Sequence, residues 1–289
     1  MNETKVIMMM NQKGGVAKTT TALNLGAALA AIGKRVLLID IDSQASLTKG
    51  LGIKPESQKY TIIEALTRLA CDEEIKPEFG IIKTSTDNMD IISGSIKGIE
   101  LEKRLDANPV QRTRELLREY IDEQRGTYDY ILIDSGPTLG TLTLNGLVAA
   151  DSVIIPCEPE PAASDGLQNM IETVFKVKQV VNHKLGIEGI LITKYDSQKK
   201  AHKIVSSQIR KEYGKKINIY GFNVPLSSEL PNAAMERKDI FSMKTKKGAC
   251  AAYEMLAYEV EHTKPEIQKY SPTKLSFIKK IFGIKEEVR

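Results

Sequence analysis

A short glycine-containing segment, set between an apolar run and a helix-like run, most constrains how this chain can fold. The apolar run is Val6 to Met10, and the segment after it reads Asn11-Gln12-Lys13-Gly14-Gly15-Val16-Ala17-Lys18-Thr19-Thr20. Glycines let a backbone turn tightly, so that consecutive N–H groups point at one group of phosphate oxygens, and a following helix adds the positive end of its dipole. The segment therefore predicts a phosphate-binding loop between a strand and a helix.

Two lysines and a threonine give this loop its expected chemistry. Lys18 is spaced to reach the terminal phosphates of a nucleotide, and the hydroxyl of Thr19 is spaced to ligate Mg²⁺. A second lysine, Lys13, stands at the start of the loop, where a plain phosphate loop does not require one.

Strand and helix signals alternate along the chain. Apolar residues recur at helical spacing from Ala22 to Ile32, and Arg35 to Asp40 is the next strand, so the loop lies inside a βαβ unit. Further strands are expected at 89–92, 128–134, 152–156, 187–193 and 217–224, and helices at 60–69, 109–124, 167–181, 199–213 and 249–260. This alternation predicts a three-layer αβα fold with a doubly wound, mostly parallel sheet.

Composition favours one soluble domain. The 289 residues are 42% hydrophobic, which is enough for one large core. We expect a single domain over residues 1–262, a linker with two prolines at 263–273, and a distinct tail at 274–289. Three cysteines lack paired spacing, and no run approaches the roughly 18 apolar residues of a membrane span. We therefore expect a cytoplasmic protein without a disulfide or zinc framework.

Acidic residues end two of the expected strands, where an α/β sheet places its ligands. Asp134 fits a Walker B aspartate, which holds magnesium directly or through water. Asp40 and Asp42 follow the second strand, where alternation sends both side chains the same way, and one of them is expected to orient an attacking water. Each acid alone is equally typical of a helix cap or a turn. The phosphate loop beside them favours the functional interpretation.

The stretch from Lys13 to Thr20 resembles the deviant Walker A box of the ParA/MinD ATPases, and most resembles the ParA type that partitions chromosomes and plasmids. The similarity continues in residues 34–44, 128–145, 189–196, 224–225 and 248–260. The resemblance implies a P-loop NTPase fold over residues 5–262, with ATP and Mg²⁺ as cofactors and weak intrinsic hydrolysis of ATP to ADP and phosphate.

The resemblance also implies roles for single residues. Two ATP-bound subunits would face each other, with Lys13 reaching the partner's phosphates, where charge develops during transfer. Lys13, Lys18 and Asp42 are then the catalytic residues, with Asp42 positioning the water, and the loop from Ser135 senses the γ-phosphate. The implied metal residues are Thr19, Asp42 and Asp134, and the implied nucleotide contacts are Lys13, Gly14, Gly15, Val16, Ala17, Lys18, Thr19 and Thr20, with adenine near Lys194, Tyr195 and Pro225.

Some positions depart from the family's pattern. Ala17 replaces a usual glycine, and Ser43 and Gly136 stand where prolines are usual, which predicts a looser switch loop. Glu229 falls in a segment where partition ATPases tend to carry DNA-binding arginines. Lysine-rich stretches offer a replacement surface for non-specific DNA, with a merely solvated face as the alternative. They comprise Lys199, Lys200, Lys203, Arg210, Lys211, Lys215 and Lys216, and a second group of Lys244, Lys246 and Lys247.

The tail is amphipathic when residues 275–285 are drawn as a helix. Six apolar side chains, among them Phe277, Ile278, Ile281 and Phe282, fall on one half of the circumference, and two of its lysines fall on the other half. This pattern resembles the membrane-targeting tail of MinD, which binds anionic lipid reversibly. Packing on the chain's own domain or on a dimer partner, and disorder, are the alternatives.

Two functions fit these features. In the first, an ATP-bound homodimer binds non-specific DNA at the bacterial nucleoid, and a centromere-binding adaptor of the ParB kind stimulates hydrolysis and release. In the second, a MinD-like positioning ATPase cycles on the membrane surface, because dimerisation joins two weak tails into one firm attachment. A metabolic kinase or reductase is a third candidate, but no acceptor pocket or cluster ligands can be read from the sequence.

Overall fold

The computed structural model describes residues 3–107, 111–243 and 248–262, and in this part of the chain eight strands form one sheet. The strand order is β3-β4-β2-β5-β1-β6-β7-β8, and only β3 runs antiparallel to its neighbour. The expected mostly parallel sheet is confirmed. The strands are β1 (Lys5–Met9), β2 (Val36–Asp40), β3 (Ile81–Lys83), β4 (Met89–Ile92), β5 (Tyr130–Asp134), β6 (Ser152–Cys157), β7 (Gly186–Tyr195) and β8 (Ile219–Pro225).

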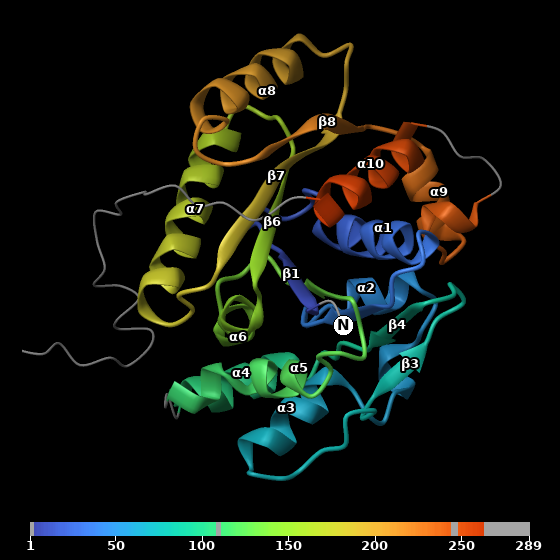
Figure 1. Cartoon of the computed structure of the whole chain (residues 1–289), viewed down its shortest axis with the longest axis vertical. Helices are drawn as coiled ribbons and strands as arrows, with labels where there is room; N and C mark the ends of the chain where they lie inside the picture. Colours follow the sequence, from blue (N-terminus) through green and yellow to red (C-terminus); the bar gives the residue numbers. More distant parts are fainter. Residues whose placement is uncertain (1–2, 108–110, 244–247, 263–289) are drawn as a thin grey trace, which may run out of the picture.

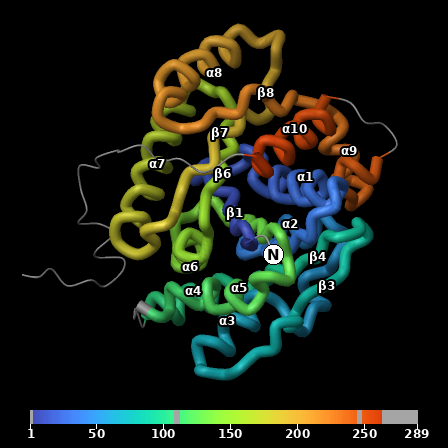
Figure 2. The backbone as a smooth tube through the Cα atoms, in the orientation of Figure 1, coloured from blue at the N-terminus to red at the C-terminus, as the bar shows by residue number. Residues whose placement is uncertain are grey.

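Helices cover both faces of this sheet, which gives the expected three layers (Figure 1). One face packs on α1, α2 and α10, and the other packs on α3 to α8. The helix α10 lies beside α1, although the two come from opposite ends of the described chain (Figure 2). The helices are α1 (Lys18–Ala31), α2 (Ser46–Gly50), α3 (Ile62–Ala70), α4 (Gly98–Ala107), α5 (Leu116–Asp122), α6 (Thr141–Ala149), α7 (Ala163–Val180), α8 (Lys200–Tyr213), α9 (Glu229–Met235) and α10 (Gly248–His262), with 3₁₀ turns at Pro55–Ser57, Gln111–Arg114 and Ile240–Ser242.

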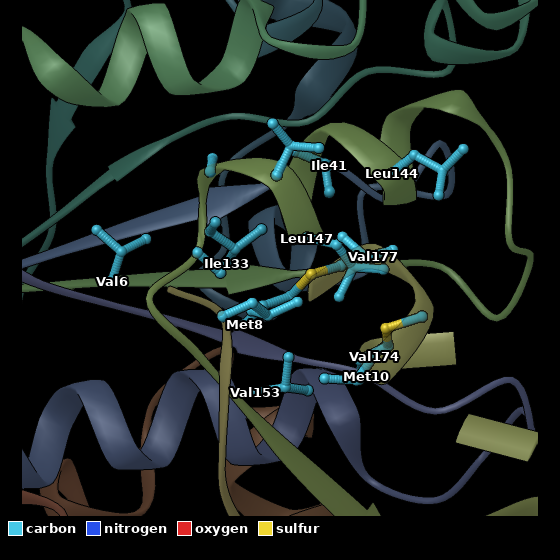
Figure 3. Packing of buried hydrophobic residues seen from close by; sticks show 14 of the residues in the cluster. Val6, Met8, Met10, Ile41, Ile133, Leu144, Leu147, Val153, Val174 and Val177 are labelled. Atoms are coloured by element: carbon cyan, nitrogen blue, oxygen red, sulfur yellow. The ribbon is translucent and has the colours of Figure 1, made fainter. Parts of the chain in front are cut away.

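The strand β1 is buried on both faces because its apolar side chains alternate between two cores. Met8 packs with residues of β5, α6 and α7, whereas Ile7 and Met9 face the core beneath α1 and α10. Figure 3 shows Met8 close to Ile133 and Leu147. The sheet order places β1 between β5 and β6, so the loop that leaves β1 emerges at the middle of the sheet.

The continuous helix expected at 109–124 is wrong. A 3₁₀ turn covers Gln111–Arg114, and α5 begins only at Leu116. The side chain of Asn145 on α6 accounts for the break. Its Nδ2 donates to the carbonyl of Thr113 at 3.0 Å, and its Oδ1 accepts from the N–H of Leu117 at 3.2 Å. These two backbone groups are four residues apart and would bond each other in a helix, so Asn145 replaces one helical hydrogen bond.

Two sets of expected residues lie outside the described part of the chain. These are Lys244, Lys246 and Lys247, and the tail with Phe277, Ile278, Ile281 and Phe282. Among the described helices, none combines the length and the apolar character that a bilayer crossing needs.

Candidate nucleotide site

The loop between β1 and α1 forms an open cradle at the carboxyl edge of the sheet. Gly15 has φ +76, a left-handed conformation that favours glycine. A Cβ atom added at Gly14 or Gly15 would meet no atom of the described residues within 4 Å, so the space in front of the loop is free. Ala17 is also left-handed, with φ 69, and precedes the first turn of α1. The predicted loop between a strand and a helix is therefore present.

Neighbouring strands hold this loop from behind. The side chain of Asn11 donates to the carbonyl of Pro156 at 2.8 Å and accepts from the N–H of Lys13 at 2.9 Å. The hydroxyl of Thr193 donates to the carbonyl of Val16 at 3.0 Å. The strands β6 and β7 therefore fix the loop at two points. These two contacts were not foreseen from the sequence, since Asn11 and Pro156 lie 145 residues apart in it and Val16 and Thr193 lie 177 residues apart.

Lys18 is nearly buried, and only 7% of it is exposed. Its Nζ lies 3.3 Å from the carbonyl oxygen of Lys13, within the cradle. Burial lowers the pKa of Lys18, whereas the carboxylates of Asp134 and Asp42 raise it. A bound polyphosphate would add further negative charge at this place and favour the protonated lysine.

Thr19 and Asp134 meet at the floor of the cradle. The Thr19 hydroxyl donates to Asp134 Oδ2 at 2.7 Å. The other oxygen, Oδ1, is buried and has no hydrogen-bond partner among the described residues. Burial and the nearby Asp40 raise the pKa of Asp134 well above its usual value. A buried acceptor without a partner, next to a hydroxyl, fits the ligand shell of Mg²⁺, which prefers oxygen donors and often keeps several waters.

Asp40 and Asp42 have different surroundings, although both follow β2. Asp40 is fully buried, and its Oδ2 accepts from the N–H of Thr48 at 2.9 Å and from the Thr48 hydroxyl at 2.7 Å. Burial raises the pKa of Asp40 to about 6. The carboxylate of Asp40 therefore anchors α2, which is the structural role considered above for an acid at the end of a strand. Asp42 is only half-buried and faces the loop after β5, where a Cβ at Gly136 would lie 3.2 Å from Asp42 Oδ1.

A pocket of about 200 Å³ opens beside the first turn of α1. Lys194 and Pro225, which were expected near adenine, line it together with Ala17 of the loop. Tyr195 does not line this pocket. Its ring packs toward the core on the α8 side, while its carbonyl accepts from the N–H of Leu226 at 2.9 Å. No local signal predicts the remaining wall, which comes from Leu226, Ser227 and the α9 residues Leu230, Pro231 and Ala234.

Lys13 forms an ion pair with Glu160 in the loop after β6. Both side chains are substantially exposed, at 43% and 46%. Exposed pairs of this kind contribute little to stability, typically about 0–1 kcal/mol. The ammonium group of Lys13 therefore sits at the rim, where a weak contact holds it.

The expected basic surface is only partly assembled. Lys199, Lys200 and Lys203 are exposed around the start of α8. Arg210, further along α8, donates instead to the carbonyl of Tyr220 at 2.9 Å and to Asn223 Oδ1 at 2.8 Å. Its guanidinium group ties α8 to β8, and we leave it out of the basic surface.

Fold and site together define a P-loop protein of the three-layer α/β class. Comparison with known proteins agrees: a family profile described as "AAA domain" matches residues 4–187. The sporulation initiation inhibitor protein Soj of Bacillus subtilis is 38% identical over 259 residues, which cover 89% of this chain and 98% of Soj. The chromosome partitioning protein ParA of Caulobacter vibrioides is 35% identical over 261 residues, with coverage of 90% and 94%.

Solved structures show the same architecture. The cobyrinic acid a,c-diamide synthase of Mycobacterium smegmatis, with a bound ATP analogue and magnesium, has a TM-score of 0.74 at 31% identity, and the match covers 88% of this chain and 93% of the synthase. A plasmid partition protein of Borrelia burgdorferi has a TM-score of 0.66 at 25% identity, with coverage of 89% and 97%. The chain belongs to the ParA/MinD family of P-loop ATPases, and it is similar to the ParA and Soj proteins within that family. The expected cofactors, ATP and Mg²⁺, agree with the ligands in the synthase structure.

Proposed function

We propose that this protein is a partition ATPase, in which ATP binding joins two subunits and hydrolysis separates them. The proposal depends on the different positions of two lysines at the cradle. One lysine, Lys18, is buried inside the cradle, and a second, Lys13, stays at its exposed rim. A lysine that only served its own nucleotide would gain most from lying inside, so the rim position favours contact with a partner's phosphates.

The roles of the site residues follow from their positions. Lys18 and the N–H groups of residues 13–19 bind the phosphates, and Pro225 and Lys194 border the base. Thr19 and Asp134 are the residues that would hold Mg²⁺, directly or through water, and the metal would neutralise charge on the transferring phosphoryl group. Asp42 lies half-exposed at the same edge, next to Gly136. We assign Asp42 to orienting the attacking water.

Partition requires a surface that the nucleotide state controls. Lys199, Lys200 and Lys203 surround the start of α8 and are exposed. We propose that the ATP-bound dimer binds DNA phosphates through these lysines without reading sequence, because lysine acts as a flexible point charge. Weak basal hydrolysis, accelerated by a centromere-binding adaptor, then sets how long the dimer stays on DNA.

Nucleotide-dependent DNA binding tests this function directly. Anisotropy of a labelled duplex is measured with the full chain in Mg·ATP, Mg·ADP and no nucleotide, over a range of salt concentrations. We expect binding in Mg·ATP only, with the logarithm of affinity falling linearly as the logarithm of salt rises. The Lys200→Ala/Lys203→Ala variant should weaken binding and reduce that slope by about 0.9 for each lost phosphate contact.

A matched control separates this surface from net charge. The Lys54→Ala/Lys184→Ala variant removes two other exposed lysines and the same charge, and it should bind DNA as the wild type does. Equal DNA binding in all three nucleotide states would contradict the switch. If both lysine pairs weaken binding equally, the assignment of DNA to α8 is wrong.

A further inference from the structure

The helix α6 begins directly after the loop that follows β5, and its own N-cap residue supplies no side-chain cap. That residue is Gly140. A carboxylate of α4, that of Glu102, takes its place, and Asp106 of the same helix binds the first side chain of α6. Glu102 Oε1 accepts from the N–H of Leu142 at 3.0 Å, and the hydroxyl of Thr141 donates to Asp106. Glu102 and Asp106 are four residues apart and share one face of α4. The helix α4 therefore holds the start of α6, which begins 34 residues after the last residue of α4.

Glu102 also packs closely against the last residue of the loop between β5 and α6. A Cβ added at Gly140 would overlap Glu102 Oε1, so the glycine allows the carboxylate to close against the last residue before α6. Burial raises the pKa of Glu102, and the hydrogen bond from Leu142 lowers it. The carboxylate is thus partly withdrawn from water, and the hydrogen bond from the N–H of Leu142 stabilises its charged form.

The other end of the same loop lies at the nucleotide site. Ser135 donates to the carbonyl of Met9 at 3.0 Å, and Gly136 passes beside Asp42. The loop is therefore fixed near the cradle by Ser135 and at its far end by Glu102.

The helix α4 also approaches the loop after β2. A Cβ at Gly98, its first residue, would lie 3.6 Å from Ser43 Cβ and 3.1 Å from Leu142 Cδ1. Ser43 directly follows Asp42. One short helix therefore touches both loops that border the expected place of the γ-phosphate.

We propose that Glu102 is a positioning residue for ATP hydrolysis: by holding the first turn of α6, it sets where residues 135–140 lie relative to Asp42. Glu102 acts through Gly140 and Leu142 and does not itself touch the nucleotide. The inference rests on the proposed function, in which Asp42 and this loop surround the γ-phosphate.

Three variants of the full chain test the role of Glu102. Glu102→Leu removes the acceptor, whereas Glu102→Gln keeps an acceptor oxygen at the same reach. Thr61→Ala is the matched control, because Thr61 caps α3 by accepting from the N–H of Glu64 at 3.2 Å, on the same face of the sheet. It removes a cap without touching the switch loop.

Steady-state ATP hydrolysis provides the first measurement. We expect Glu102→Leu to lower kcat by about 10-fold or more, since misplacement of a reacting group is costly. KM should change by less than about twofold, because the phosphate contacts remain. Glu102→Gln should restore most of kcat, and Thr61→Ala should leave kcat unchanged while lowering the thermal midpoint. An equal loss of kcat in Thr61→Ala and Glu102→Leu would show a structural effect only and overturn the proposal.

Hydrogen exchange of the nucleotide-free chain provides the second measurement. Peptides covering residues 135–145 should exchange about 10-fold faster in Glu102→Leu than in the wild type, as expected for the loss of a helix cap. Thr61→Ala should leave these peptides unchanged. Unchanged exchange in Glu102→Leu overturns the positioning contact, whether or not the chain hydrolyses ATP. A wild-type chain that hydrolyses no ATP overturns the proposed function instead.

Discussion

The hydroxyl of Thr19 donates to one oxygen of the Asp134 carboxylate at 2.7 Å, while the second oxygen of that carboxylate is buried without a partner among the described residues. The bond joins the first turn of α1 to the end of β5, on adjacent sides of the cradle. It orients the Thr19 oxygen and the Asp134 oxygens toward the same space. A metal ion bound at this place would supply the partner that the second oxygen lacks and would favour the ionised carboxylate.

Replacing the Asp134 carboxyl group with an amide should stabilise the protein when no nucleotide is added. The folded state raises the pKa of Asp134, so the folded state binds its proton more tightly than the unfolded chain does. Stability is then lost as pH rises from the unfolded value of about 4 toward the folded value. The Asp134→Asn variant has no carboxyl group at this position to ionise, so it does not lose this stability as pH rises. Its free energy of unfolding should exceed that of the wild type by about 1 kcal/mol or more at pH 8, and the difference should vanish near pH 3.

The same variant should lose the metal-dependent part of nucleotide binding. Calorimetric titration with ATP, with and without Mg²⁺, measures this part. In the wild type Mg²⁺ should tighten ATP binding, and in Asp134→Asn it should not. A variant that is less stable than the wild type at pH 8, or that keeps its Mg²⁺ response, would contradict this account of Asp134.

Asp42→Ala should separate binding from hydrolysis. Asp42 is half-exposed beside Gly136, and its Oδ1 accepts from the N–H of Gln44 at 3.0 Å, so a hydrogen bond within the loop after β2 holds its carboxylate. ATP affinity should therefore change little, and the ATP-bound dimer should persist. Hydrolysis should fall by about 10²-fold, as for loss of a group that positions a water. The control is Asp87→Ala, an exposed carboxylate in the turn before β4, and normal hydrolysis in Asp42→Ala would exclude Asp42 from this role.

Lys13→Ala should retain one-subunit ATP binding and lose ATP-dependent dimerisation. The Lys13 side chain lies at the rim and contacts Glu160 rather than the cradle floor. Sedimentation velocity in Mg·ATP measures the dimer, and calorimetry measures ATP binding. Lys18→Ala, which empties the cradle of its buried cation, should lose both. Dimerisation of Lys13→Ala at wild-type ATP concentrations would refute a role for this lysine across the interface.

Ala17→Gly should stabilise the fold. A left-handed conformation costs a residue with a Cβ roughly 1–2 kcal/mol, and Ala17 has φ 69. Glycine relieves this strain but gains entropy in the unfolded chain, so the free energy of unfolding should rise by about 0–1 kcal/mol. Ala251→Gly, at an exposed position inside α10, should instead lower it by about 1 kcal/mol. Denaturant titration compares the two, and destabilisation in both would show that Ala17 is not strained.

The described strands other than β3, and the phosphate loop, were predictable because local signals decide them. A continuous apolar run such as Val6–Met10, which is buried on both faces of the sheet, is typical of a central parallel strand. The interrupted helix before α5 was not predictable, since Asn145 lies 28 residues away from the backbone group it captures. Long-range side-chain contacts of this kind leave no mark on local periodicity.

Local sequence pattern did not distinguish between two residues that share it. Alternation sends Asp40 and Asp42 the same way, yet Thr48 of α2 takes the carboxylate of Asp40 and leaves Asp42 accessible. In the same way, Lys194 and Tyr195 are neighbours in β7, but only Lys194 borders the pocket. Which of two adjacent residues reaches a site is set by the elements that pack against them.

The central place of β1 in the sheet has a consequence for synthesis on the ribosome. The phosphate cradle is made first, from residues 11–20, but Thr193 and Pro156, which hold it in place, are translated much later. The pocket beside it closes only when β8 and α9 emerge. A nascent chain that ends before β8 and α9 thus possesses its phosphate loop without the residues that line the pocket beside it. Nucleotide retention by stalled chains of increasing length would report when the polypeptide has become complete enough to hold its ligand.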